Sequence, residues 1–354
     1  MSAENLSRPN LFSYATSELS QDAFICWLAA WADLKYKDTD PALYNVARTF
    51  VGSMIHKVDS QSGYDIADIK TVGIGRQVGK LDVLIEVNKG LPNQLAILVE
   101  DKTHTSNHSD QLNRYYDQIK AKEYTESEII PVYFKTGYQS RFDTLGAFKP
   151  YLRSDFLKVL QQSKNEGLTN AIFDDFLSHL EQIELAISQF STKPLNDWRD
   201  NDWRGFYMAL YDSLKTYGGD WGNVSNKSGG FLGFWWYGVE ENTLSYAPYL
   251  QLETRYFNHK LPDNIRHNLC FKISVKDKSS ASSAWKDAAE KLVRASQQLN
   301  IPLNLTKRSD GLSMTITRWS NNYLVEKNGL LDLDATLANL KKAQEVLDAA
   351  FKAA

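Results

Sequence analysis

Hydrophobic and polar positions along the first 190 residues follow two different periods. Apolar residues at helical spacing predict helices, and short runs of Val, Ile and Leu bounded by Gly, Pro or Asn predict strands. The predicted order is helix 11–33, helix 42–56, strands 66–75, 80–88 and 94–102, helix 109–122, strand 128–134, and helices 152–163 and 168–190. Strands bracketed by helices in this way are typical of a mixed α/β core, which we expect over residues 1–190.

The composition changes at STKPLNDWRDNDWRG, residues 191–205, which predicts a linker running into a new helix. Residues 206–354 are expected to form a second, α+β domain that recognises substrate, binds a partner or mediates assembly. Its predicted elements are strands 231–240, 244–257, 268–276 and 312–319, with helices 283–299 and 333–351. The aromatic residues Phe234, Trp235, Trp236, Tyr237, Tyr246 and Tyr249 either pack in its core, which is the commoner role on strands, or stack on bases.

Charge and cysteine content narrow the classes of protein that fit. The 354 residues contain 40 Lys and Arg against 43 Asp and Glu, so any nucleic-acid binding would use a local patch. The two cysteines, Cys26 and Cys270, lie far apart in apolar contexts and are expected to be buried free thiols. No apolar stretch approaches the length of a signal core or a membrane span, so we expect a soluble, cytoplasmic protein.

Three charged residues end the apolar run LAILVEDK, residues 95–102. In a strand, Glu100 and Lys102 share one face and Asp101 points to the other. An acid and an amine at the end of a buried strand cost desolvation energy unless something compensates them. The compensation is either an ion pair or a metal site.

A second carboxylate enters the preceding strand near its start. If the two strands pair antiparallel, Asp82 comes close to Glu100, and two neighbouring carboxylates raise each other's pKa. Mg²⁺ or Mn²⁺ would relieve this repulsion, with Lys102 beside the ion. A structural ion pair among Asp82, Glu100 and Lys102 remains the alternative. One face of the strand is predicted to carry Leu81, Val83, Ile85 and Val87, and the other Asp82, Leu84 and Glu86.

Asp82 followed by the triplet Glu100-Asp101-Lys102 resembles the PD-(D/E)XK nuclease superfamily, and the order of elements is similar to its restriction-endonuclease-like core. ELSQDAFICWLAAW, residues 18–31, resembles the acid-bearing first helix of one branch. SDQLNRYYDQI, residues 109–119, resembles a helix carrying a Gln-x-x-x-Tyr pair, here Gln111 and Tyr115. Leu81 stands where the motif's name has proline, a common departure. The resemblance covers residues 1–190.

The resemblance implies a role for each matching residue. Asp82, Glu100, the backbone carbonyl of Asp101 and Glu18 would hold a Mg²⁺ or Mn²⁺ ion. Lys102 would orient the attacking hydroxide and Gln111 would hold a phosphate or a ligand carboxylate. Asp22 competes with Glu18 for the upstream acidic role. Tyr115 would lie over the site with Gln111 and contact the nucleic acid.

Other residues have less specific signals. Arg76 and Lys80, just before Asp82, are candidate phosphate contacts and equally well ordinary solvated charges. Arg255, Lys260, Tyr256 and His259 would form a modest basic rim on the second domain. His104 and His108 are four apart but are expected on the surface rather than on a metal.

The resemblance implies a metal-dependent phosphodiesterase, an endonuclease whose expected substrate is DNA rather than RNA. Microbial defence or DNA processing is the context that the resemblance implies. A homodimer and a defence-system partner fit that context, and a membrane partner does not. The rival is a non-catalytic nucleic-acid- or protein-binding module on the same fold.

Overall fold

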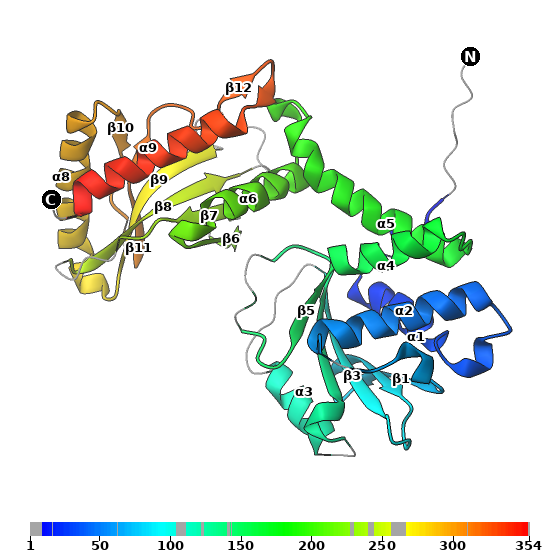
Figure 1. Ribbon diagram of the computed structural model, residues 1–354. Helices are drawn as coiled ribbons and strands as arrows, with labels where there is room; N and C mark the ends of the chain where they lie inside the picture. The colour runs from blue at the N-terminus through cyan, green and yellow to red at the C-terminus, as the bar shows by residue number, and fades with distance from the viewer. Residues whose placement is uncertain are drawn as a thin grey trace, which may run out of the picture. The chain divides into compact units, whose positions relative to one another are not determined.

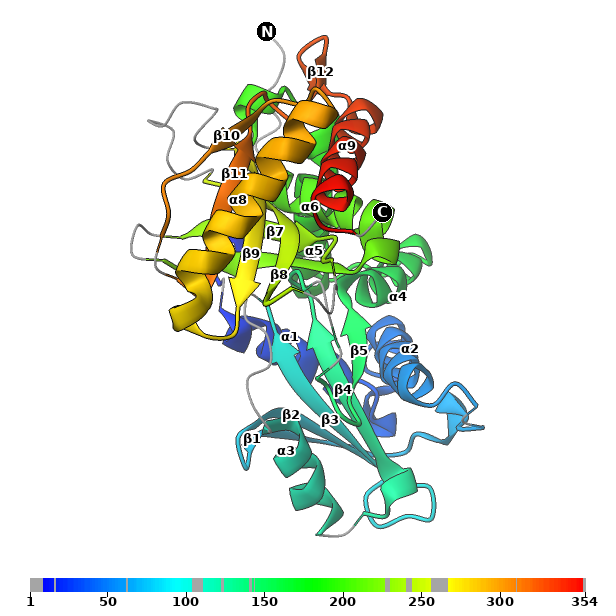
Figure 2. The same ribbon diagram turned by 90° about the vertical axis from the view of Figure 1, so that its left-hand side faces the viewer.

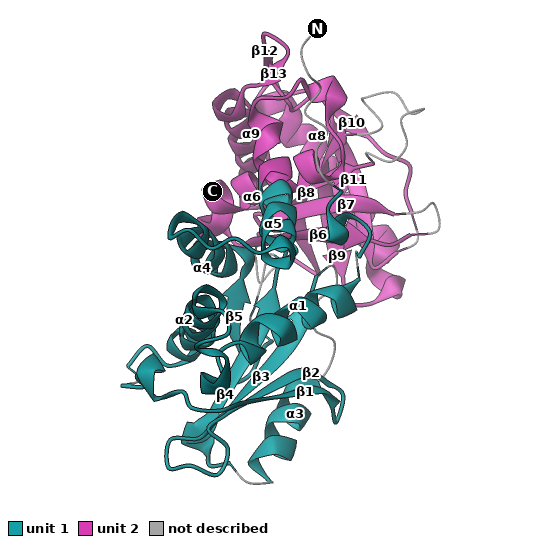
Figure 3. Cartoon of the chain, turned by 90° about the vertical axis from the view of Figure 1, so that its right-hand side faces the viewer, with its two compact units in different colours: residues 1–184 teal, residues 185–354 magenta. Residues whose placement is uncertain are grey.

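The chain divides into two compact units, residues 1–184 and 185–354, which are described separately (Figure 3). The computed structural model describes residues 9–15, 17–61, 63–103, 111–121, 124–139, 142, 144–226, 230–239, 244–255, 267–309 and 311–352.

The first unit is built on a five-stranded mixed sheet whose strands lie side by side in chain order (Figure 2). The strands are β1 (Val72–Val78), β2 (Leu81–Val87), β3 (Leu95–Lys102), β4 (Ile129–Lys135) and β5 (Lys149–Leu152). The first three pair antiparallel, and β3, β4 and β5 pair parallel. A parallel neighbour requires a crossover between β3 and β4, and α3 lies in that connection.

Helices cover both faces of this sheet. They are α1 (Glu18–Ala30), α2 (Pro41–Val58), α3 (Gln111–Lys120), α4 (Arg153–Asn165) and α5 (Ala171–Ser188). Helices α1 and α2 lie on one face and α3 lies on the other (Figure 1). Asp40 begins α2 by accepting the Leu43 N–H at 3.0 Å, and Pro41 stands at the first helical position.

Strand alternation divides the apolar side chains into two cores. Val83, Ile85, Ile97 and Val99 join the core under α1 and α2. Phe24 of α1 stacks on Phe176 of α5 in that core, with ring centroids 3.8 Å apart. The core under α3 contains Leu84, Ala96 and Leu98 from the strands with Leu112, Tyr115 and Ile119 from the helix.

The turn between β1 and β2 places Asp82 at the start of its strand. Gly79 and Lys80 have φ of 62° and 80°, and Val78 pairs with Leu81 across them. Two central residues with positive φ give a turn that matches the right-handed twist of a hairpin. Glycine adopts a positive φ readily, and lysine does not. Gln77, with φ of 51°, is a further non-glycine residue in the left-handed region here.

Several predicted boundaries were wrong. The first helix begins at Glu18, and a separate 3-10 turn covers Leu11–Ser13. Residues 66–68 form a 3-10 turn instead of a strand, because Asp65 accepts the Ala67 N–H at 2.8 Å and starts that turn. Leu81 packs in the core under α3, not with Val83, since it lies directly after the turn. Within the predicted linker, residues 200–205 already belong to a helix.

The second unit contains a six-stranded antiparallel sheet in the order β10-β11-β9-β8-β7-β6, with helices α6, α8 and α9 packed on it (Figure 2). The helices are α6 (Asp200–Leu214), α8 (Ala281–Gln298) and α9 (Leu333–Phe351). The strands are β6 (Gly219–Val224), β7 (Phe231–Trp236), β8 (Tyr246–Thr254), β9 (His267–Val275), β10 (Leu303–Leu305) and β11 (Ser313–Trp319), and a small hairpin is formed by β12 (Glu326–Lys327) and β13 (Leu330–Leu331). This is the α+β architecture expected from the sequence.

Aromatic residues of the second unit serve mainly its core. Phe234, Trp236 and Tyr246 are buried, whereas Trp235 and Tyr249 are half-buried. Of the predicted basic rim, Arg255 pairs with Glu253 at 3.3 Å and lies over the Phe231 ring. The other three rim residues, Tyr256, His259 and Lys260, lie outside the described residues.

Both cysteines are buried and free, as predicted. In the described part of the chain, every helix is too short or too polar to cross a membrane.

A glycine close to the end of β3 gives the first testable prediction. A Cβ added to Gly137 would stand 1.6 Å from the carbonyl oxygen of Thr103. We expect Gly137→Ala to destabilise the protein by about 1–3 kcal/mol, as overpacking usually does, and to lower the calorimetric melting temperature. Gly63→Ala is the matched control, because its added Cβ meets no atom within 4 Å. Equal melting temperatures for the two variants would contradict this reading.

Candidate active site

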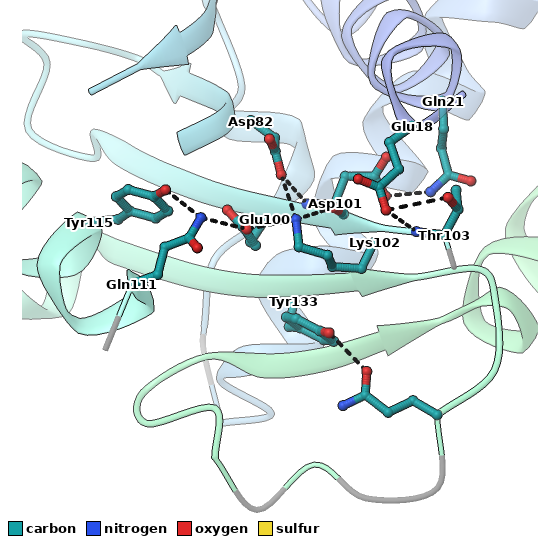
Figure 4. A network of polar contacts seen from close by, with 11 residues as sticks. Glu18, Gln21, Asp82, Glu100, Asp101, Lys102, Thr103, Gln111, Tyr115 and Tyr133 are labelled. Carbon is teal, nitrogen blue, oxygen red and sulfur yellow. Dashed lines mark hydrogen bonds and ion pairs between the residues drawn. The ribbon is translucent and has the colours of Figure 1, made fainter. Parts of the chain in front are cut away.

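The pairing of β2 with β3 brings two acidic residues together at one end of the sheet (Figure 4). Val83 pairs with Val99, and continuing that register sets Asp82 opposite Glu100. Asp82 accepts the backbone N–H of Asp101 at 2.9 Å, which holds its carboxylate against the end of β3. The Asp82 side chain is 26% exposed and Glu100 is fully buried, so the pair opens toward solvent on the Asp82 side.

The Lys102 ammonium lies between these two acids. Its Nζ is 2.8 Å from Oε1 of Glu100 and 3.5 Å from Oδ2 of Asp82. The same Nζ donates to the backbone carbonyl of Asp101 at 2.8 Å. Burial would lower the pKa of Lys102, but Glu100 and Asp82 together raise that pKa above its ordinary value. Lys102 is therefore held as a cation.

Glu100 is also held from α3. Gln111 donates from Nε2 to Oε1 of Glu100 at 3.2 Å and to the Tyr115 hydroxyl at 2.5 Å. Gln111 and Tyr115 share a helix face because they are four residues apart. Burial and the charge of Asp82 raise the pKa of Glu100 to about 7. Among the described residues, Oε2 of Glu100 is buried and has no hydrogen-bond partner.

Asp101 points to the opposite face, as strand alternation predicted, and meets α1. Gln21 donates to Oδ1 of Asp101 and accepts from the Thr136 hydroxyl at 2.5 Å. Burial and the charge of Asp22 raise the pKa of Asp101 well above its usual range. Burial and the charge of Asp82 raise the pKa of Asp22 to about 6. These acids form a second buried pair behind the strand.

Glu18 contacts the chain immediately after the triplet. Its Oε1 accepts the Thr103 backbone N–H at 3.0 Å and the Thr103 hydroxyl at 3.4 Å. The Thr103 carbonyl accepts from the buried ammonium of Lys135 at 3.1 Å. Glu18 therefore ties α1 to the end of β3, and its charge also contributes to the raised pKa of Lys102. Asp22 faces Asp101 instead, so the two rival upstream acids have different neighbours.

Arg76 and Lys80 are exposed, on β1 and in the turn before Asp82. Within the described residues, neither forms an ion pair. The positive charge of Arg76 lowers the pKa of the nearby Asp22, an effect smaller than that of burial.

The oxygens around Lys102 suit a hard divalent cation, because they comprise two carboxylates and a backbone carbonyl. Oε2 of Glu100 is a further buried carboxylate oxygen, and among the described residues it has no hydrogen-bond partner. The described part of the chain contains no group of three or more Asp, Glu, His or Cys side chains that could together hold a metal ion. A divalent metal at this site would therefore be held by Asp82, Glu100, the Asp101 carbonyl and water.

Three residues near the site were not predicted from the sequence. Gln21, Thr103 and Thr136 contact the triplet or its neighbours from distant parts of the chain. Gln21 lies within the ELSQD run, which was the only pointer to it. The predicted surface histidines His104 and His108 lie outside the described residues.

Comparison with known proteins assigns the family. A family model described as the PD-(D/E)XK nuclease superfamily matches residues 9–190, just over half of the chain. The chain belongs to this superfamily, whose members are generally nucleases that use divalent metals. The curated proteins and the solved structures gave no match.

The buried acid behind β3 makes stability depend on pH. The pKa of Asp22 is near 4 in the unfolded chain and about 6 in the folded protein. Between these two values the folded protein holds a proton that the unfolded chain has lost, so the free energy of unfolding falls as pH rises through that window. We expect Asp22→Asn to be more stable than the wild type at pH 8, by up to about 3 kcal/mol, and to lose that advantage toward pH 4.

Melting temperatures measured from pH 4 to pH 8 test this expectation. Asp38→Asn removes an exposed carboxylate instead and is the control. If the difference between Asp22→Asn and the wild type does not change with pH, the buried acid does not titrate as described.

Proposed function

We propose that this protein is a divalent-metal-dependent endonuclease that hydrolyses phosphodiester bonds in DNA. The observation that carries the proposal is the convergence of Asp82, Glu100 and Lys102 at the open end of β3, within the region that defines the family. The two carboxylates and the Asp101 carbonyl would hold Mg²⁺ or Mn²⁺. Such an ion lowers the pKa of a bound water and polarises the scissile phosphate.

The protein's own residues would complete the site. Gln111 keeps the Glu100 carboxylate oriented through its amide. Lys102 would supply a positive charge next to the attacking oxygen and next to the negative charge that develops on the phosphoryl oxygens. Glu18 fixes the end of β3 through Thr103, which makes it a positioning residue here and a water-mediated ligand at most. Arg76 and Lys80 would contact backbone phosphates.

The wider setting follows from this activity. Cutting both strands of a duplex takes two hydrolysis events, so we propose a homodimer as the form that cuts duplex DNA. The second unit would recognise substrate or a partner protein. Microbial defence or DNA processing in the cytoplasm is the setting we propose.

Cleavage assays test the catalytic proposal. We expect plasmid and linear DNA to be cut with Mg²⁺ or Mn²⁺ and to remain intact with EDTA. Asp82→Asn and Lys102→Met should each lower the rate by at least about a hundredfold, because each removes a charge on which the transition state depends. Lys158→Met, an exposed change on α4, is the control. Folded protein that neither binds Mn²⁺ nor cuts DNA or RNA would favour the non-catalytic binding module.

Salt dependence of binding tests the phosphate contacts. We expect Arg76→Gln and Lys80→Gln each to weaken DNA binding and to reduce the slope of log affinity against log salt by about 1. Fluorescence anisotropy with catalytically inactive Asp82→Asn protein measures this without cleavage. An unchanged slope, matching that of Lys158→Gln, would mean that the two side chains are ordinary solvated charges.

A further inference from the structure

The Lys102 ammonium occupies a position surrounded by oxygen. Its three neighbours are Oε1 of Glu100, Oδ2 of Asp82 and the carbonyl oxygen of Asp101, at 2.8, 3.5 and 2.8 Å (Figure 4). The Lys102 side chain is only 13% exposed, so water contributes little to solvating the charge. These three oxygens are also the ones that the proposed function assigns to a divalent metal.

An ammonium and a metal ion cannot share these oxygens. Mg²⁺ binds oxygen at about 2.0–2.1 Å, and the three oxygens would have to contract around it. Nζ at its present position would then lie within the coordination sphere and be repelled by the ion. Either the metal fails to bind there, or the ammonium leaves.

We propose that Lys102 is a resident cation which a divalent metal must displace from Asp82, Glu100 and the Asp101 carbonyl. The inference rests on the proposed function and adds a competition to it. The ammonium keeps the fully buried Glu100 compensated when no metal is bound. On metal binding it moves toward the Asp82 side, where the site is open and where a phosphate would approach.

Competition makes metal affinity the direct readout. Mn²⁺ binding is measured by isothermal titration calorimetry on the full chain, without nucleic acid. Lys102→Met keeps an unbranched side chain that is one atom shorter and removes the competing charge, so it should bind Mn²⁺ about tenfold more tightly or better. Asp82→Asn should lose this binding in both backgrounds, which assigns the measured site.

A nearby charge could also change affinity through its field alone, and Arg76→Gln separates the two effects. Arg76 lies close enough to affect Asp22, and the described structure gives it no contact with the three oxygens. We expect Arg76→Gln to tighten Mn²⁺ binding much less than Lys102→Met does. Equal gains in the two variants would overturn the displacement.

A crystal structure of the wild type with Ca²⁺ gives the second measurement. Nζ of Lys102 should lie beyond hydrogen-bond distance of Glu100 Oε1 and of the Asp101 carbonyl. Metal bound with Nζ still on both oxygens would overturn the proposal, and so would Lys102→Met with wild-type or weaker Mn²⁺ affinity.

Failure of this inference is distinguishable from failure of the proposed function. If the wild type cuts DNA with metal and Asp82→Asn does not, while Lys102→Met binds Mn²⁺ no more tightly, the nuclease stands and the displacement falls. If no variant binds Mn²⁺, both fall.

Discussion

The first unit has to bury the end of a strand that carries three consecutive ionisable residues. Glu100 and Asp101 have no exposed surface, and an uncompensated buried carboxylate costs several kcal/mol. Alternation along β3 divides this cost between the two faces of the sheet. Glu100 is compensated by Lys102 and Gln111 on one face, and Asp101 by Gln21 on the other. Both faces of the sheet therefore need polar side chains packed against the end of β3.

The helices that cover the sheet are therefore tied to the site as well as to the apolar core. Helix α1 supplies Gln21 to Asp101 and Glu18 to Thr103, so it holds the end of β3 from behind. Helix α3 supplies Gln111 to Glu100 from the front. A shift of either helix would move a carboxylate, and rigid support of this kind is what a catalytic site requires.

Local patterns were sufficient to predict part of this arrangement. The alternation of β3 predicted the opposite directions of Glu100 and Asp101, and the spacing of Gln111 and Tyr115 predicted a shared helix face. The contacts of Gln21 with Asp101 and Glu18 with Thr103 join residues about eighty positions apart, and no short-range period encodes them. Boundaries failed where one side chain decides them, as at Asp65, and the short strands β5 and β10 carry too few residues for a period.

The position of Lys102 makes the ion pair and the metal site compatible interpretations of the triplet. A structural ion pair and a metal site were alternatives because each explains why charges end a buried strand. The three oxygens around Nζ allow both, because the ion pair compensates the acids when no metal is bound and the same oxygens are hard ligands. Lys102 would then stabilise the buried acids when no metal is bound and take part in the reaction when metal is bound. Its location in this structure alone therefore does not argue against catalysis.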